Sequence, residues 1–376
     1  STVFGPNSMA GQINVRSADP GPELERSIRV AFGSDALQQL SGVLNLPLAP
    51  ELGLRVGGYS LRANGFRDNR FLDRDNTNRR REEVVRLKAR YVSGGGTQVK
   101  GTAFFTRLDN GYDAWAPDNN EELVTYSDRP GQDKQETLGG SIRAKLPLSG
   151  LGKLVSITSY SHTDQIYSYD GDWGNDRFWG QDPYGVEGWS YDYFDETDRE
   201  RTTVAQELRL LNDDVSGGSA AAGLFYKDLK EKDRASGWLF SGLASALNST
   251  FDITDLAVYG QYSRSLRPSL SVTLNGRADR YDIAYRGQSD AGPEPLVIDA
   301  QEWLLGGKVA LVYRATSTAS VYGALSRGYR PGGINQHPYL AAIDRPFDPE
   351  FMTTLEVGGH WSTARSTTAL TLFHAG

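Results

Sequence analysis

Cysteine is absent from this chain of 376 residues, and methionine occurs only twice. A chain without cysteine forms no disulfide framework and offers no thiolate nucleophile, no Cys-ligated zinc and no iron–sulfur cluster. Basic residues do not dominate either, because 40 Lys and Arg against 47 Asp and Glu give a net charge of −7. General nucleic-acid binders carry a basic excess for their phosphate contacts. We therefore expect no nucleic-acid partner.

Long apolar runs are also missing. No run reaches 18 residues and the mean hydropathy is −0.49, so the sequence predicts no membrane-spanning helix. A transmembrane β-barrel remains compatible with these values, because its strands are apolar only at every second position.

Catalytic patterns are lacking as well. The four histidines are scattered without metal-ligand spacing, and neither a G-x-S-x-G elbow nor a phosphate-binding loop occurs. We expect no catalytic residue, no resident metal, no cofactor and no enzymatic activity.

Strict alternation of apolar and polar residues is what the sequence does have. In residues 270–279, Leu270, Val272 and Leu274 alternate with Ser271 and Thr273. Such a period of two predicts a β-strand with one apolar and one polar face. We predict fifteen strands, at 24–34, 37–46, 52–62, 82–92, 97–107, 138–146, 153–163, 202–212, 219–230, 254–264, 270–279, 300–312, 318–327, 351–362 and 367–373.

The connections between these strands alternate between short and long. The short ones are rich in Gly, Pro, Asn, Asp and Ser, as tight turns require. The predicted long loops are 63–81, 108–135, 164–201, 231–250, 283–299 and 328–350. Outer-membrane barrels have short periplasmic turns and long extracellular loops. The all-β alternative, a soluble sandwich or propeller, fits less well, because its strands and loops are usually shorter.

Both ends of the chain carry family motifs. Residues 4–20 read FGPNSMAGQINVRSADP, and this segment resembles the end of the plug domain of TonB-dependent outer-membrane receptors; Gln12 departs from the usual small or apolar residue. Residues 326–335 read SRGYRPGGIN and are followed by FDPE at 347–350 and LEVG at 355–358. These segments resemble a barrel strand that enters an extracellular loop, and the strand that returns.

The resemblance implies a fold, a place and a function. It implies a transmembrane antiparallel up-and-down β-barrel of 22 strands, of which about 15 are present here, with a plug in its lumen. Residues 1–20 would be the end of the plug and 21–376 the N-terminal and central barrel. The resemblance further implies the outer membrane of a Gram-negative bacterium, the TonB–ExbB–ExbD system as partner, and import of a ferric siderophore. Import of an oligosaccharide, cobalamin or another organic nutrient remains an alternative, as does a passive porin.

Aromatic residues crowd the predicted loop 164–201 and alternate there with carboxylates. Such side chains suit capture of a planar small-molecule ligand, although self-packing or an interfacial aromatic girdle would use the same residues. Our candidate ligand-binding residues in extracellular loops are Tyr167, Tyr169, Trp173, Trp179, Tyr184, Trp189, Tyr191, Tyr193, Arg327, Tyr329, Arg330 and Asn335. The plug motif would comprise Gly5, Asn7, Gly11, Ile13 and Asn14.

Two weaker hypotheses concern ions and lipids. The carboxylates of residues 170–176 alternate in a way that suits Ca²⁺, but the EF-hand register fails at Gly174. The basic run at 79–81 suits contact with lipopolysaccharide phosphates, and equally suits a solvated surface.

Overall fold

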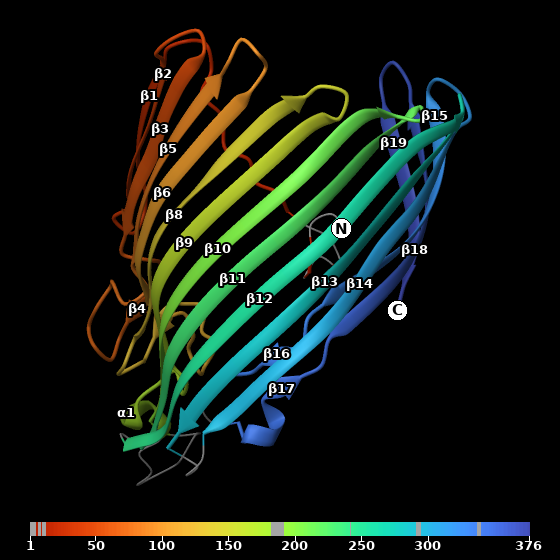
Figure 1. Ribbon diagram of the computed structural model, residues 1–376. Helices are drawn as coiled ribbons and strands as arrows, with labels where there is room; N and C mark the ends of the chain where they lie inside the picture. Colours follow the sequence, from red (N-terminus) through yellow and green to blue (C-terminus); the bar gives the residue numbers. More distant parts are fainter. Residues whose placement is uncertain are drawn as a thin grey trace.

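The computed structural model describes residues 5–6, 9, 13–181, 192–240, 242–290, 295–336 and 340–376. Their dominant feature is one antiparallel sheet of fifteen strands, in which each strand pairs with the next one along the chain that belongs to the sheet. This arrangement confirms the fifteen predicted strands and their up-and-down order. The strands curve around a common interior (Figure 1).

The strands of this sheet grow longer toward its middle, from eight residues in β1 to 26 in β12. Their bounds are β1 (Glu25–Phe32), β2 (Gln38–Pro47), β3 (Leu52–Ala63), β5 (Arg80–Val92), β6 (Gln98–Tyr112), β8 (Gly131–Leu148), β9 (Gly152–Asp170), β10 (Tyr193–Val215), β11 (Gly218–Leu239), β12 (Gly242–Arg267), β13 (Leu270–Ser289), β14 (Leu296–Arg314), β15 (Ala319–Arg330), β18 (Glu350–Ser362) and β19 (Thr367–Ala375).

Several predicted loops are wrong in extent. The predicted loop 231–250 is mostly strand, because β11 continues to Leu239 and β12 begins at Gly242. The loop 164–201 shrinks in the same way, since β9 runs to Asp170 and β10 begins at Tyr193. The predicted loop 283–299 is also shorter, because β13 ends at Ser289.

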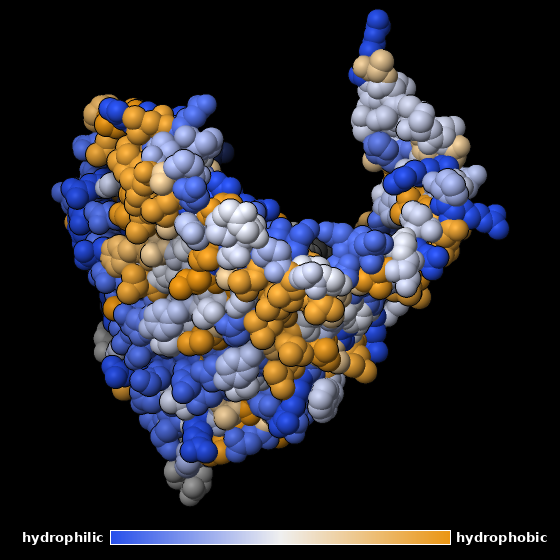
Figure 2. Space-filling view, turned by 45° about the horizontal axis from the view of Figure 1, so that its top comes forward, coloured by the Kyte–Doolittle hydropathy of each residue, from blue (hydrophilic) through white to orange (hydrophobic). Residues whose placement is uncertain are grey.

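Alternation gives the sheet an apolar outer face and a polar inner face. In β13, Leu274 is 44% exposed on the outside, whereas Arg277 and Asp279 are buried on the inside. Hydrophobic side chains gather in a broad zone over the strands, and hydrophilic side chains predominate below it (Figure 2). The sheet therefore presents opposite chemistries to its two sides, as the sequence predicted.

The inner face also holds a small apolar core. Ile253, Tyr281, Ile283 and Leu304 project inward from β12, β13 and β14, and Tyr329 packs against them. This cluster lies near the middle of β12, β13 and β14 and at the end of β15. It stiffens the wall there, because these five side chains are almost completely removed from solvent.

Short elements lie within the long connections. They are β4 (Asp68–Asn69), β7 (Val124–Thr125), α1 (Asp176–Trp179), β16 (Gly333–Ile334), η1 (Ala342–Asp344) and β17 (Pro346–Phe347). In the described part of the chain, no helix has both the length and the apolar character needed to cross a membrane. In Figure 1 the short elements gather at the lower end of the sheet, opposite the short turns.

Candidate functional site

A pocket opens on the inner face of the sheet at the end that carries the long connections. Its volume is about 270 Å³. Strands β9, β10 and β11 form its wall, and the connection between β15 and β18 covers one side. The lining residues are Tyr167, Tyr169, Asp195, Glu196, Thr197, Arg199, Asp233, Ala235, Ser236, Asn335 and Gln336. The fold therefore brings together Tyr167, Tyr169 and Asn335, which come from two distant segments of the predicted site.

A row of tyrosines follows the wall of this pocket. The ring centroids of Tyr112 and Tyr167 are 5.1 Å apart, those of Tyr167 and Tyr169 are 5.9 Å apart, and those of Tyr169 and Tyr193 are 6.4 Å apart. Tyr167 and Tyr169 share one face because strand side chains repeat with a period of two. The rings form a continuous aromatic surface with polar edges.

Asp195 holds the end of this row in place. The hydroxyl of Tyr169 donates to its Oδ2 at 2.7 Å, and the hydroxyl of Tyr193 donates to the same oxygen at 2.5 Å. Gly171 leaves room for the Tyr193 ring, because an added Cβ would lie 1.7 Å from that ring. The two hydroxyls thus fix the orientation of their rings in advance of any ligand.

Opposite charges form the polar side of the pocket. Arg199 donates from Nε and Nη2 to the two carboxylate oxygens of Asp233, at 2.7 and 2.6 Å. Its Nε also lies 3.5 Å from Oε1 of Glu231. A bidentate pair of this kind has a fixed geometry and gives the pocket a rigid, planar group beside its aromatic surface.

The connection after β15 is anchored on the same wall. Gln336 donates from Nε2 to Oε1 of Glu231 at 2.9 Å, and its Oε1 accepts from the Ser249 hydroxyl at 2.8 Å. Asn335 precedes this anchor and lines the pocket directly. A segment more than a hundred residues distant in sequence thereby closes one side of the site.

Three long connections are joined into one assembly outside this pocket. β4 and β7 pair in parallel, and the Asn69 amide donates to Asp113 at 2.9 Å and to the Ser127 carbonyl at 2.7 Å. The Asn175 amide donates to the Tyr126 carbonyl at 2.6 Å. These hydrogen bonds connect the loops after β3, β6 and β9 into one network.

The predicted aromatic residues of this assembly have different surroundings. Trp173 is 41% exposed and stacks on Trp115 at a centroid distance of 6.0 Å. Trp179 instead packs edge-on against Phe178 at 5.4 Å, and its Nε1 donates to Asp172 at 3.2 Å. Trp173 is thus open to solvent, whereas Trp179 packs inside the assembly.

Several predicted loop residues lie on strands instead. Tyr167 and Tyr169 belong to β9, and Tyr193 is the first residue of β10. We predicted a loop for these residues because both faces of the strand ends are polar or aromatic, and this composition conceals the period of two that marks a strand. Tyr184, Trp189 and Tyr191 lie outside the described residues.

The predicted cluster at 327–330 also lies on a strand, β15, and not in a loop. The Arg327 guanidinium stacks on Phe351 at 4.4 Å, and Arg330 pairs with Glu350 at 3.6 Å. Tyr329 is buried and its hydroxyl donates to Asp279. These three residues support the wall, and none of them lines the pocket.

Of the residues in the predicted plug motif, Gly5 lies against the inner face of the sheet. A Cβ on Gly5 would meet the Arg277 guanidinium at 3.2 Å. Further along, Asp19 accepts from Lys88 at 2.6 Å and also pairs with Lys100. Ile13 and Asn14 are exposed, and Asn7 and Gly11 lie outside the described residues. The boundary between the end of the plug and the barrel at residue 20 stays a prediction.

The sequence reasoning missed the polar half of the pocket. Asp195, Arg199 and Asp233 fall in segments that we assigned to loops, and Gln336 follows the last residue of the motif. Only the pairing of the strands reveals this part of the pocket, because Arg199 lies directly across from Asp233 in the register of β10 and β11.

The carboxylates of the suggested calcium segment accept protein hydrogen bonds. Oδ1 of Asp170 accepts from the backbone N–H groups of Asp172 and Trp173, and Oδ1 of Asp172 accepts from that of Gly174. Across the ranges that the structure describes, no group of three or more His, Cys, Asp or Glu residues is arranged to hold a metal ion.

The loop assembly has a predicted pH response, centred on Asp128. Burial, together with the nearby Asp192 and Asp172, raises the pKa of Asp128 to about 6. This carboxyl keeps its proton in the closed assembly up to about pH 6, but loses it near its ordinary pKa of 3.8 when the assembly opens. Closure is therefore favoured at low pH, and this stabilisation is lost as the pH rises from about 4 through 6.

We expect loops 113–130 and 171–181 to exchange amide hydrogens more slowly at pH 5 than at pH 7, after correction for intrinsic rates. The difference should correspond to on the order of 1 kcal/mol, since Asp128 is half-exposed and partly screened. Asp128→Asn should remove the difference. An unchanged pH response in that variant would contradict the assignment.

Comparison with known proteins gives one family match and many structural ones. Residues 35–375 match the family model described as TonB dependent receptor-like, beta-barrel. The ferric yersiniabactin uptake receptor FyuA from Yersinia pestis is 18% identical, with a TM-score of 0.84, and the match covers 100% of this chain and 57% of that one.

Two further solved structures are similar. The siderophore receptor PiuA from Acinetobacter baumannii is 14% identical with a TM-score of 0.77, over 98% of this chain and 59% of that one. The ferric-catecholate import receptor Fiu from E. coli is 14% identical with a TM-score of 0.71, over 100% of this chain and 61% of that one. At such identities the likeness is one of fold. The chain spans roughly three fifths of the length of these structures.

Proposed function

Because the chain belongs to the family of TonB-dependent receptors, whose members are transporters and not enzymes, we propose that the complete protein imports a ferric siderophore across the outer membrane. The family match extends over residues 35–375 and thus over nearly all of the sheet. Similar folds occur in receptors whose names specify ferric yersiniabactin and ferric catecholate. These names supply the substrate class that we propose.

The observation that carries the proposal is the pocket of tyrosines and charged residues on the inner face. It lies on the inner face of the sheet, at the end that bears the long connections, and in our proposal the imported ligand passes there. The rings of Tyr167 and Tyr169 suit contact with the flat, aromatic groups of a phenolate or catecholate chelate. Asn335 adds an amide that donates and accepts hydrogen bonds.

The two faces of the sheet support the membrane setting. Leu224, Leu256 and Leu274 are exposed on the outer face, where a bilayer would cover them. The long connections would then lie outside the cell, and the short turns in the periplasm. We further propose that the TonB–ExbB–ExbD system supplies the energy for import, and that the segment ending at residue 20 belongs to the plug that it moves.

Uptake by cells tests the proposal. The complete receptor is expressed in a Gram-negative strain that lacks its own siderophore receptors and is starved of iron. We expect growth and accumulation of labelled iron with at least one chelate from a panel of ferric catecholates, phenolates and hydroxamates. Both should disappear when TonB is deleted. Saturable uptake of cobalamin or an oligosaccharide, with no uptake of any ferric chelate, would overturn the substrate class.

A further inference from the structure

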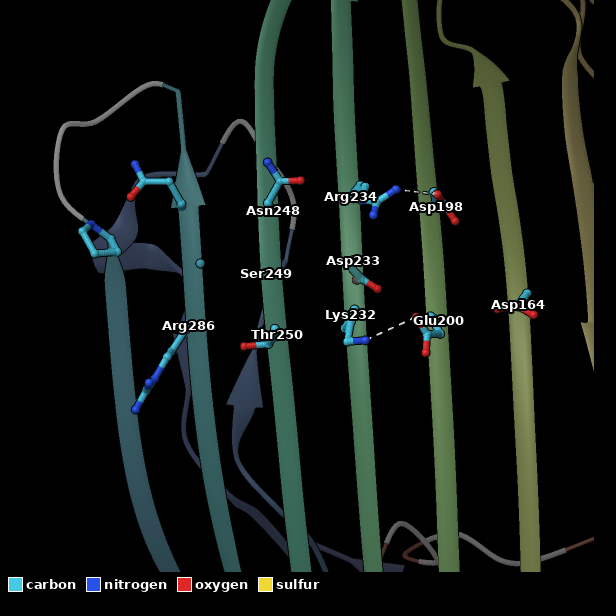
Figure 3. A pocket seen from close by; sticks show the side chains of 13 residues that line it. Asp164, Asp198, Glu200, Lys232, Asp233, Arg234, Asn248, Ser249, Thr250 and Arg286 are labelled. Atoms are coloured by element: carbon cyan, nitrogen blue, oxygen red, sulfur yellow. Dashed lines mark hydrogen bonds and ion pairs between the residues drawn. The ribbon is translucent and has the colours of Figure 1, made fainter.

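Strand β14 is paired along its length on one side but only in part on the other. Its pairing with β13 runs without interruption from Leu296 to Tyr313, whereas its pairing with β15 begins only at Gly307. In the described part of the chain, residues 296–306 make no backbone–backbone hydrogen bond except those to β13. We call residues 296–306 the open edge. Figure 3, drawn around a pocket over β9 to β13, shows β14 beside β13, and no ribbon runs along its far side in this view.

The backbone groups of β14 alternate in direction. The N–H of Arg314 donates to the carbonyl of Ser269 at 2.8 Å, so the even-numbered residues of β14 point to β13. Because the pairing with β13 has no register shift, the odd-numbered residues point away from β13. A row of N–H and C=O groups of this kind is a template for a further strand. In the open edge these residues are Val297, Asp299, Gln301, Trp303 and Leu305.

The chain itself keeps this edge open. If β15 continued in register, residues 328–336 would pair with it. However, Pro331 lacks an N–H group, and Gly332 and Gly333 disfavour a strand. The chain instead turns toward the inner face, where the N–H of Gly332 donates to Oε2 of Glu302 at 3.2 Å. Further barrel strands would not cover the edge either, because β15 already occupies the place next to β14 in the sheet.

Part of the open edge lies beyond the apolar zone of the outer face. From Trp303 to Leu311 the outward positions of β14 are apolar or glycine, whereas Asp299 and Gln301 are polar and exposed. Asp299 on the outer face and Glu302 on the inner face give the edge a carboxylate on each side. Residues 296–306 contain neither proline nor lysine, which commonly protect edge strands from pairing. The edge is thus accessible from water at the end of the sheet that bears the long connections.

We propose that the open edge docks an extended segment of a second protein, which adds to the sheet as a strand beside β14. Backbone hydrogen bonds to Val297, Asp299 and Gln301 supply the affinity, and alternate side chains supply the specificity. The two carboxylates favour a segment with a basic residue near its centre, and the exposed Val297 and Trp303 favour apolar outward side chains. That the segment comes from outside the cell rests on the proposed outer-membrane location. The docking is independent of the nutrient that the receptor imports.

Hydrogen exchange tests whether the edge is open in the complete, detergent-purified receptor. We expect the amides of Asp299 and Gln301 to exchange about tenfold or more faster than those of Ala300 and Glu302, which point to β13. Residue-resolved mass spectrometry measures the four rates. If all four amides exchange equally slowly, another part of the receptor already covers the edge and the proposal is wrong.

A synthetic peptide tests the docking itself. The probe is a fluorescently labelled peptide of about seven residues with blocked ends, in which threonine and valine flank a central lysine. Its binding to the complete receptor is measured by fluorescence anisotropy and compared with that of Gln301→Pro. Proline removes one N–H from the edge and leaves the bonds to β13 intact, because residue 301 points away from β13. Gln301→Ala is the matched control, since it loses the same side chain but keeps the N–H.

We expect Gln301→Pro to bind the probe about tenfold or more weakly than the parent, because the added strand loses a backbone partner and meets the proline ring. Gln301→Ala should stay within about twofold of the parent. Asp299→Lys should weaken binding of the lysine peptide and strengthen binding of a peptide with glutamate in its place. A probe with the same side chains but N-methylated amides should bind about tenfold or more weakly.

Three results would overturn the proposal. They are equal binding by Gln301→Pro and the parent, equal binding of the N-methylated and the unmodified probe, and no binding of either the lysine or the glutamate peptide to the parent. Iron uptake by Gln301→Pro should match that of the parent, so loss of docking and loss of import are separate results.

Discussion

Tyr169→Ala in the complete receptor should weaken binding of the ferric chelate about thirtyfold. The Tyr169 ring sits between Tyr167 and Tyr193, and Asp195 fixes its hydroxyl, so a ligand meets it already oriented. Removal of a buried aromatic contact often costs about 2 kcal/mol, which equals that factor. Equilibrium binding to folded, detergent-purified receptor measures the effect.

Two control variants distinguish the loss of a ligand contact from damage to the strand that carries Tyr169. Tyr160 lies on the same strand but is 47% exposed on the outer face, so Tyr160→Ala should leave affinity unchanged. Tyr169→Phe keeps the ring and removes only the hydrogen bond to Asp195, so its effect should be smaller than that of the alanine variant. If Tyr160→Ala and Tyr169→Ala weaken binding equally, the pocket is not the ligand site.

Leu274→Arg should lower the free energy of unfolding by roughly 2–4 kcal/mol in a bilayer. Leu274 is the middle one of the five outward apolar positions between residues 270 and 278 of β13, so the charge would enter the hydrocarbon near its midplane. Denaturant titration of the complete barrel in lipid vesicles measures this change, with the heat-modifiable form on gels as the sign of correct folding.

Asn275→Arg is the paired control. Asn275 follows Leu274 and points to the inner face of the sheet. Arg277, two residues further along β13, points to the same polar face. Its cost should be well below that of Leu274→Arg, because the lumen is polar. Equal costs would mean that the two faces of β13 do not differ in environment, and the orientation of the sheet would then be wrong.

Part of the candidate site was visible in the sequence. The aromatic crowding between residues 164 and 201 led to Tyr167 and Tyr169, and the motif near residue 330 led to Asn335. The partners of these residues were not visible, because Arg199 and Asp233 meet across two strands whose register no local pattern reveals. Trp179 shows the opposite error, since a tryptophan in an aromatic loop packs inward or faces outward according to tertiary contacts.

The sequence by itself determined the fifteen strands, their antiparallel order and the face that each of their central residues presents. It did so because an apolar exterior forces strict alternation, which is a local signal. The tertiary structure alone decided how far β9 to β13 continue beyond that apolar zone. There both faces are polar, as Lys232 outside and Asp233 inside show, so alternation of hydrophobicity ends while backbone pairing continues. The tyrosine pocket lies in that extension.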